Sequence, residues 1–250
     1  MSYLTYTPRK LKQHLAQDHK ITPMSTYLQE IVYGGVDGIV TTFAVVAGFA
    51  GAQASSQIGN IGYMTVLLFG LANLFADASS MGLGNLLSLR SEQDRFQKER
   101  KKELHEIKNT PEVEKAETVM ILRQQGFTLE QAGALTELYA TNPSYWADFM
   151  MRYELEIPDP MGENPYLTSI ATFIAFQVFG VIPLLPFIFF EPGEGIFQWA
   201  IFATGSALFI LGILRWYITR QTLVRAVGEV LLLGSISASV AYLVGSLFNL

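Results

Sequence analysis

Five long segments of this chain are almost free of charge, and this feature restricts its fold more than any other. The segments are residues 31–52, 61–89, 166–190, 196–214 and 226–250, and their only charged side chains are Asp37, Asp77 and Glu229. A helix needs about 20 mainly apolar residues to cross the hydrocarbon core of a bilayer. The sequence therefore predicts an all-α polytopic membrane protein with five transmembrane helices.

The charge that these segments lack is concentrated between the second and third of them. Residues 91–163 hold 24 of the 39 charged side chains. Residues 91–108 have a helix-forming composition without Gly or Pro, which predicts that span two continues as one helix to residue 108. Proline at a helix start and Thr128 as an N-cap predict three more helices, at residues 111–125, 129–140 and 143–157. The predicted domains are a tail (1–30), spans one and two (31–90), a helical insert (91–163) and spans three to five (164–250).

Lysine and arginine indicate the orientation of the chain. In a five-span arrangement all 17 of them fall on one side, whereas the loops 53–60 and 191–195 on the other side carry none. Basic loops stay in the cytoplasm. We therefore expect a cytoplasmic N-terminus and insert, with the C-terminus across the membrane. Residues 4–20 of the tail are a candidate for contact with the membrane surface.

Composition also excludes several classes of function. The chain has no cysteine, which rules out disulfides and thiolate metal sites. Its net charge of −5 argues against a nucleic-acid partner. No phosphate-binding glycine loop, HExxH motif or Ser–His–Asp set is present, and residues 1–30 lack the apolar core of a signal peptide. We therefore expect neither an enzyme nor a tightly bound cofactor.

Acids inside the predicted spans are candidate functional groups, because a carboxylate in the bilayer is costly. At 1.5 Å per residue, Asp37 lies about 9 Å in from the cytoplasmic end of span one, while Met81 and Asp77 lie about 14 and 20 Å deep in span two. Asn73, Thr41 and Thr42 can add neutral oxygens. These groups predict a path for a divalent cation; the alternatives are that Asp37 caps a broken helix before Gly38 and that Met81 only fills space. For Glu229, pairing with a nearby arginine and a role in transport stay equally open.

The insert carries a second set of candidate ligands. Glu99, Glu103 and Glu106 share one helix face, Glu114 and Glu117 are one turn apart, and Glu154 is one turn from Met150 and Met151. Carboxylates suit hard divalent ions and thioethers suit softer transition metals, so Fe²⁺ and Mn²⁺ fit the combination. The alternative is a solvated face paired with neighbouring lysines.

Four ordered motifs resemble segments of the vacuolar iron transporter family. They are DGIVTTFAVVAG in span one, ADASSMGLGNLLSLRSEQD in span two, FMMRYEL in the insert and GVIPLLP in span three, within a likeness that extends from about residue 27 onwards. The resemblance implies a homodimer with five spans per subunit that exchanges cytoplasmic Fe²⁺, often also Mn²⁺, for protons.

The resemblance also implies which residues handle the ion. It assigns Asp37 and Met81 to the transport path, Glu30 to its cytoplasmic mouth, and Glu103, Glu106, Glu114, Glu117, Met150, Met151 and Glu154 to metal capture in the insert. A glutamate of the family's second span aligns with Asn73 here, and Asp77, one turn further on, is the expected substitute.

The expected substrate is therefore Fe²⁺ or another divalent metal, and the expected location is a bacterial plasma membrane or a vacuolar membrane. A membrane-anchored metal sensor or buffer without transport is the alternative. A di-iron oxidase is disfavoured, since no Glu-x-x-His pair is present.

Overall fold

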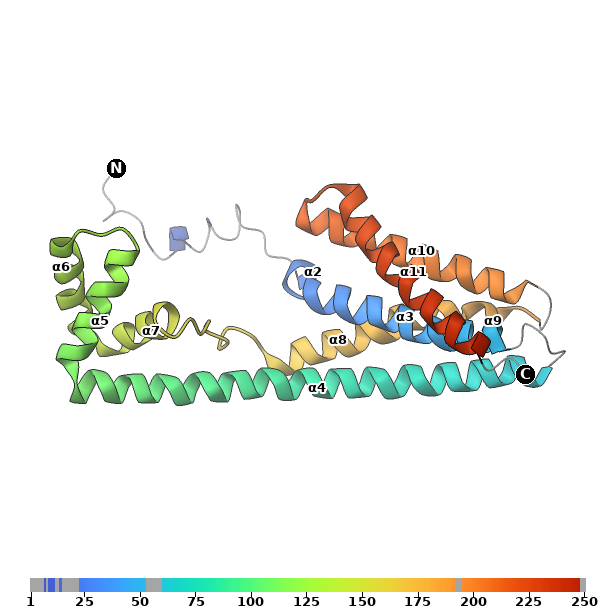
Figure 1. Ribbon diagram of the computed structural model, residues 1–250, viewed down its shortest axis with the longest axis horizontal. Coiled ribbons are helices and arrows are strands. Elements are labelled where there is room, and N and C mark those ends of the chain that lie inside the picture. The colour runs from blue at the N-terminus through green and yellow to red at the C-terminus, as the bar shows by residue number, and fades with distance from the viewer. Residues whose placement is uncertain are drawn as a thin grey trace. The chain divides into compact units, whose positions relative to one another are not determined.

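The computed structural model describes residues 7, 9–11, 14, 23–52, 60–191 and 195–247, which form helices and turns but no strand. Most of the tail lies outside the described residues, including the predicted membrane-surface segment 4–20 except for residues 7, 9–11 and 14, as does most of the loop 53–60. The helices are α2 (Pro23–Thr26), α3 (Leu28–Ala52), α4 (Asn60–Asn109), α5 (Pro111–Gln124), α6 (Leu129–Ala140), α7 (Pro143–Tyr153), α8 (Pro165–Gly180), the 3₁₀ turn η2 (Ile182–Leu184), α9 (Leu185–Phe189), α10 (Ile196–Thr219) and α11 (Leu223–Leu247) (Figure 1).

Five helical segments are long and apolar enough to cross a membrane: Leu28–Ala52, Gly62–Asn109, Pro165–Phe189, Ile196–Thr219 and Leu223–Leu247. Their outer faces carry large apolar side chains, and Leu68, Phe202 and Leu232 are each more than 60% exposed. Monomeric soluble proteins rarely expose contiguous apolar surface on this scale. The predicted all-α polytopic fold is confirmed.

The chain divides into two compact units. The membrane unit comprises Met1–Asn85 and Tyr166–Leu250, and the insert unit comprises Leu86–Pro165. Helix α4 contributes to both, as the continuous helix predicted for span two and the residues that follow it. The predicted domain boundary at residue 90 is the point where charged residues begin, which reflects the edge of the bilayer and not the packing of the two units. Which residues lie in the cytoplasm and which in the membrane stays a prediction.

In the membrane unit, α3, α10 and α11 pack against one another (Figure 1). Helices α3 and α8 also approach closely, because a side chain on Gly34 would lie 2.7 Å from the carbonyl oxygen of Thr172 and one on Gly38 would contact that of Phe176. The small residues Gly34 and Gly38 of span one therefore form the face that packs against α8.

The third span is interrupted at its prolines. Helix α8 ends at Gly180, and the chain continues through η2, which contains Pro183, into the short α9, which contains Pro186. Proline has no N–H to continue the hydrogen-bond ladder. The third span therefore changes helix type at its prolines.

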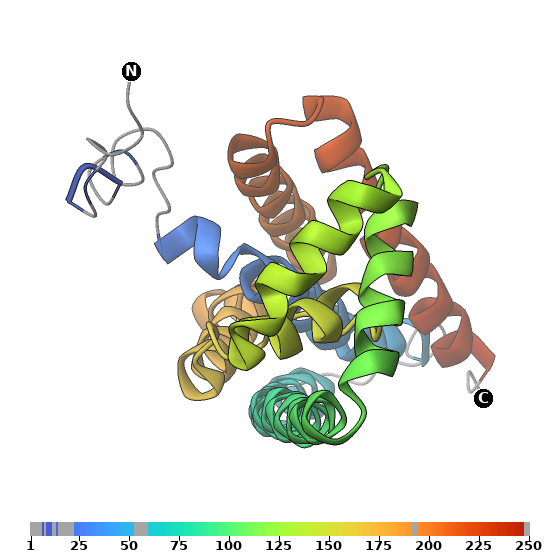
Figure 2. The ribbon, with the colours of Figure 1, turned by 90° about the vertical axis from the view of Figure 1, so that its left-hand side faces the viewer.

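The insert unit is built around a compact apolar core. Ile107, Ile121, Leu122, Trp146 and Phe149 are buried together in it. Helices α5 and α6 are neighbours in this unit and α7 packs against α6 (Figure 2).

Local signals define the helix ends in the insert, with one exception. Thr128 and Gln131 form a reciprocal capping box at the start of α6, as the predicted N-cap requires. Helix α7, however, ends at Tyr153 and not at residue 157. The N–H of Ile157 donates to the Met151 carbonyl, and Glu156 has a left-handed φ of 53°, so the chain leaves the helix before the prolines are reached.

Candidate metal sites in the insert and the spans

Three glutamates from three helices converge in the insert unit. Glu103 belongs to α4, Glu114 to α5, and Glu154 follows the last residue of α7. One carboxylate oxygen from each lies within 4.8 Å of the other two. Such an arrangement lets three acids bind the same cation. The sequence predicted the separate helices that carry these acids but did not show that they converge.

Two of these acids are buried without sufficient hydrogen bonds. Glu103 is 3% exposed and Glu114 is 5% exposed. Glu103 Oε1 and Glu114 Oε2 have no hydrogen-bond partner in the part of the chain that the structure describes. A buried carboxylate is stable only when a proton, a cation or a donor compensates it, and the alternative of a solvated, salt-bridged face is therefore wrong for Glu103.

Burial and mutual repulsion oppose ionisation of all three acids. Burial, a hydrogen bond with the Glu114 carboxyl and repulsion from neighbouring carboxylates raise the pKa of Glu103 to about 8. Burial is also the largest cause that raises the pKa of Glu114; Glu154 is an exposed residue, and partial burial of its carboxyl group together with repulsion from neighbouring glutamates raises its pKa. A divalent cation would reverse this balance, because its charge stabilises the ionised oxygens.

Two other predicted ligands lie at the edge of this group. Glu106 and Glu117 repel the clustered acids electrostatically, but no oxygen of either belongs to the converging set. Glu106 is partly exposed and lies 3.6 Å from Lys102, an ion pair of the kind expected for a solvated helix face. These acids add negative potential to the site, while Glu99 and His105 do not join the converging group.

The two predicted sulfur ligands are fully enclosed. Met150 is 0% exposed and Met151 is 1% exposed, so both side chains are shielded from solvent. The sulfur of Met150 lies 3.2 Å from the hydroxyl oxygen of Thr118. Sequence reasoning missed Thr118; the available signal was its position one turn after Glu114, on the same helix face.

An ion pair attaches α7 to α4 beside the site. Arg100 Nε donates to Asp148 Oδ1 at 2.6 Å, and its Nη2 donates to the Ser144 hydroxyl at 2.8 Å. Arg100 precedes Glu103 by three residues, and Asp148 precedes Met150 by two. This contact was also missed, because its two partners lie 48 residues apart in the sequence, a separation that no helical spacing marks.

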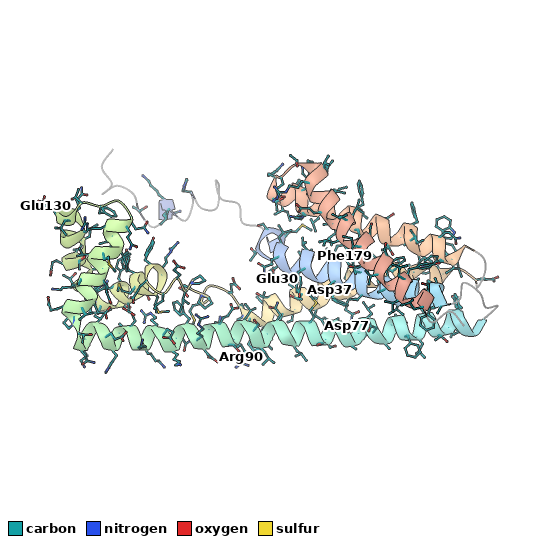
Figure 3. The ribbon with its side chains drawn as sticks, in the orientation of Figure 1. Glu30, Asp37, Asp77, Arg90, Glu130 and Phe179 are labelled. Atoms are coloured by element: carbon teal, nitrogen blue, oxygen red, sulfur yellow. The ribbon has the colours of Figure 1, made fainter. Side chains whose placement is uncertain are left out.

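In the membrane unit, Asp37 on α3 and Asp77 on α4 come from neighbouring helices and lie close enough to repel each other (Figure 3). The Asn73 side-chain N–H donates to Asp77 Oδ2 at 2.7 Å, while Thr41 donates its hydroxyl to the Asp37 carbonyl at 2.8 Å. Asp37 does not cap a broken helix, since α3 is continuous around it. The structure thus brings both acids and Asn73 together.

The remaining span residues lie around this pair. Met81 is partly buried, one turn beyond Asp77, and packs against Leu74, Ala78 and Phe176. Glu30 is partly buried in the first turn of α3 (Figure 3). The hydroxyl of Thr42 is fully buried and has no hydrogen-bond partner among the described residues.

Glu229 is held by two arginines. Arg215 Nη1 lies 2.7 Å from Glu229 Oε2, and Arg225 Nε lies 2.9 Å from Oε1. Pairing with arginine therefore accounts for this acid without a role in transport, because both carboxylate oxygens already have cationic partners.

Five apolar spans with carboxylates facing one another inside them, and a second group of carboxylates in a helical insert, define a membrane protein suited to handling cations. Comparison with known proteins makes the class more specific. The chain belongs to the VIT family, whose model matches residues 28–246. The predicted family membership is confirmed, and since this is a family of transporters, so is the expectation that the protein is not an enzyme.

Curated relatives resemble the chain over most of its length. It is 34% identical over 233 residues to a protein named vacuolar iron transporter 1 from Arabidopsis thaliana, covering 92% of this chain and 90% of the relative. It is 34% identical over 252 residues to a vacuolar iron transporter from Toxoplasma gondii, covering 96% and 81%. A vacuolar iron transporter from Plasmodium falciparum is 33% identical, covering 87% and 81%.

Proposed function

We propose that this protein transports divalent transition metal ions, Fe²⁺ and also Mn²⁺, out of the cytoplasm in exchange for protons. The observation that carries the proposal is the convergence of Glu103, Glu114 and Glu154, where two buried oxygens have no hydrogen-bond partner among the residues that the structure describes. The names of the relatives support iron as the substrate. We further propose that the working unit is a homodimer in a vacuolar or bacterial plasma membrane.

Capture in the insert is the first step. The three acids supply hard oxygens, and the enclosed Met150 and Met151 supply softer donors. This mixture favours Fe²⁺ and Mn²⁺ over Mg²⁺, which prefers oxygen ligands and keeps its water. Glu106 and Glu117 add to the negative potential that concentrates cations near the site.

Passage through the membrane is the second step. Glu30 receives the ion at the cytoplasmic mouth of the path. Asp37, Asp77 and Met81 then bind it between spans one and two. Asn73 and Thr41 are neutral neighbours of this path. Protons compete with the cation for these carboxylates. A lower pH on the far side of the membrane therefore favours release of the ion there.

A flux assay in proteoliposomes tests the proposal. Fe²⁺, Mn²⁺, Zn²⁺ and Ca²⁺ are offered with and without a pH gradient, and we expect uptake of Fe²⁺ and Mn²⁺ that is accompanied by proton movement. Metal binding without any flux would instead support a membrane-anchored sensor or buffer.

Asp37→Ala is expected to abolish uptake while the protein keeps its helical content and still binds metal in the insert. The reason is that the variant removes a carboxylate of the path and leaves the insert unit unchanged. Glu163→Ala, at an exposed position of the insert unit, is the control and should retain flux. Wild-type rates in Asp37→Ala would refute its assignment.

Asp77→Asn separates coupling from conduction. If Asp77 takes the role of the family's second-span glutamate, the variant should lose metal-driven proton flux by about a hundredfold or more, the usual contribution of a positioned acid–base group. Proton flux that stays coupled to metal uptake would exclude this role.

A further inference from the structure

Thr118 links two of the proposed metal-binding helices through one hydroxyl group. It is fully buried on α5, one turn after Glu114, so the two side chains share a helix face. Its oxygen lies 3.2 Å from the sulfur of Met150 on α7. The Met150 carbonyl in turn accepts the N–H of Glu154, which follows α7 by one residue.

The hydrogen-bond partners of Thr118 determine what its hydroxyl can do. Trp146 Nε1, which can only donate, donates to Thr118 Oγ1 at 2.7 Å. The single hydroxyl proton of Thr118 then has two acceptors within reach, the Glu114 carbonyl oxygen at 2.7 Å and the Met150 sulfur at 3.2 Å. The proton can rotate from one to the other without movement of any heavy atom.

We propose that Thr118 is a positioning residue that directs the Met150 thioether toward the metal and thereby sets the preference of the insert for transition metals over hard cations. This inference rests on the proposed function of the insert. When the site is empty, the hydroxyl donates to the sulfur and fixes its place. When a cation takes a sulfur lone pair, the hydroxyl donates to the Glu114 carbonyl, so no buried donor is left without an acceptor in either state.

The chemistry of the donor atoms explains why loss of the Thr118 hydroxyl should change the preference of the insert for transition metals over Ca²⁺. A thioether adds affinity for softer transition metals and almost none for Ca²⁺, which binds oxygen. The carboxylates serve both kinds of ion. Loss of the correctly placed sulfur therefore weakens one kind of binding and spares the other, whereas general damage to the insert would weaken both.

Metal affinities of the full-length protein in detergent test this inference, with Co²⁺ as an air-stable transition metal and Ca²⁺ as the hard ion. Thr118→Val has nearly the same volume but no hydroxyl, and we expect it to weaken Co²⁺ binding about tenfold, as is typical when a group that orients a ligand is removed. Ca²⁺ affinity should stay as in the wild type. Thr118→Ser keeps the hydroxyl group and should bind Co²⁺ with the affinity of the wild type.

A double-mutant cycle with Met150→Leu provides the second readout. If Thr118 acts through this sulfur, Thr118→Val should add no further loss of Co²⁺ affinity to Met150→Leu. Thermal unfolding verifies that each variant is folded, and Thr118→Ala replaces Thr118→Val if the valine variant is not.

Three results would overturn the inference: an equal loss of Co²⁺ and Ca²⁺ affinity, an unchanged Co²⁺ affinity, or losses that multiply in the double variant. If the wild-type protein binds neither ion in the insert, both the role of Thr118 and the proposed capture of metal by the insert are wrong. A change in selectivity without any transport in liposomes would sustain the role of Thr118 and contradict transport alone.

Discussion

At the scale of single residues, the decisive property of the insert is the environment of Glu103. Its carboxyl group is almost completely enclosed, and one oxygen has no partner among the described atoms. Burial raises its pKa from an ordinary 4.5 to about 8. Between these values the folded insert holds a proton that the unfolded chain has lost, so rising pH destabilises the metal-free insert and favours metal binding.

Glu103→Gln should therefore stabilise the metal-free protein at pH 8 by about 1–3 kcal/mol, the usual cost of a buried polar group without a partner, and by much less at pH 5. Thermal unfolding at the two pH values measures this difference. The same variant should bind Co²⁺ more weakly and release fewer protons on binding. Glu112→Gln, whose side chain is 86% exposed, is the matched control and should change neither quantity. An identical pH profile for Glu103→Gln and the wild type would contradict this account.

At the scale of helices, glycines decide how closely the spans pack. Gly38 and Gly180 bring the backbones of α3 and α8 together, and Gly180 also meets Leu74 of α4. Asp37 directly precedes Gly38, so this contact fixes the height at which its carboxylate enters the membrane unit. Small residues have the same effect wherever membrane helices pack without a hydrophobic driving force.

Gly38→Ala should destabilise the membrane unit by about 1–3 kcal/mol, because the added methyl group would collide with the Phe176 backbone. Thermal unfolding in detergent measures the loss. Gly205→Ala is the control, since a methyl group there meets no atom within 4 Å. Equal shifts in both variants would show that helix propensity, rather than close packing, governs the response.

At the scale of the whole molecule, the distribution of charge predicts on which side of the bilayer each part lies. Every lysine and arginine falls on one side of the five-span arrangement. The Arg215–Glu229–Arg225 group, which joins the end of α10 to the start of α11, belongs to that side. The proposed direction of transport depends on this orientation, because the insert must meet the metal before the spans do.

Single cysteines can test the orientation cleanly, because the chain has none of its own. Glu130→Cys lies in the first turn of α6 and Glu191→Cys between spans three and four, both at exposed positions. After expression in a bacterial plasma membrane, an impermeant maleimide should label position 191 from outside intact cells and position 130 only in inverted vesicles. The reverse pattern would invert the proposed direction of transport.

The sequence by itself determined the elements of this protein. Spans follow from the length of apolar runs, and the helices of the insert follow from Pro111, Thr128 and Pro143, because these signals act within one turn of the chain. The end of α7 was the exception, since residues 154–157 are compatible with a helix until Glu156 adopts its left-handed conformation.

Tertiary structure alone decided which candidate ligands meet. Helical spacing put Glu103 and Glu106 on one face, yet only Glu103 converges with Glu114 and Glu154, while Glu106 lies beside Lys102. Tertiary packing also pairs Glu229 with two arginines and places the sulfur of Met150 beside the Thr118 hydroxyl. The physical reason is that a sequence fixes the direction of a side chain relative to its own helix axis, whereas the rotation of one helix against the next is fixed only when their side chains pack.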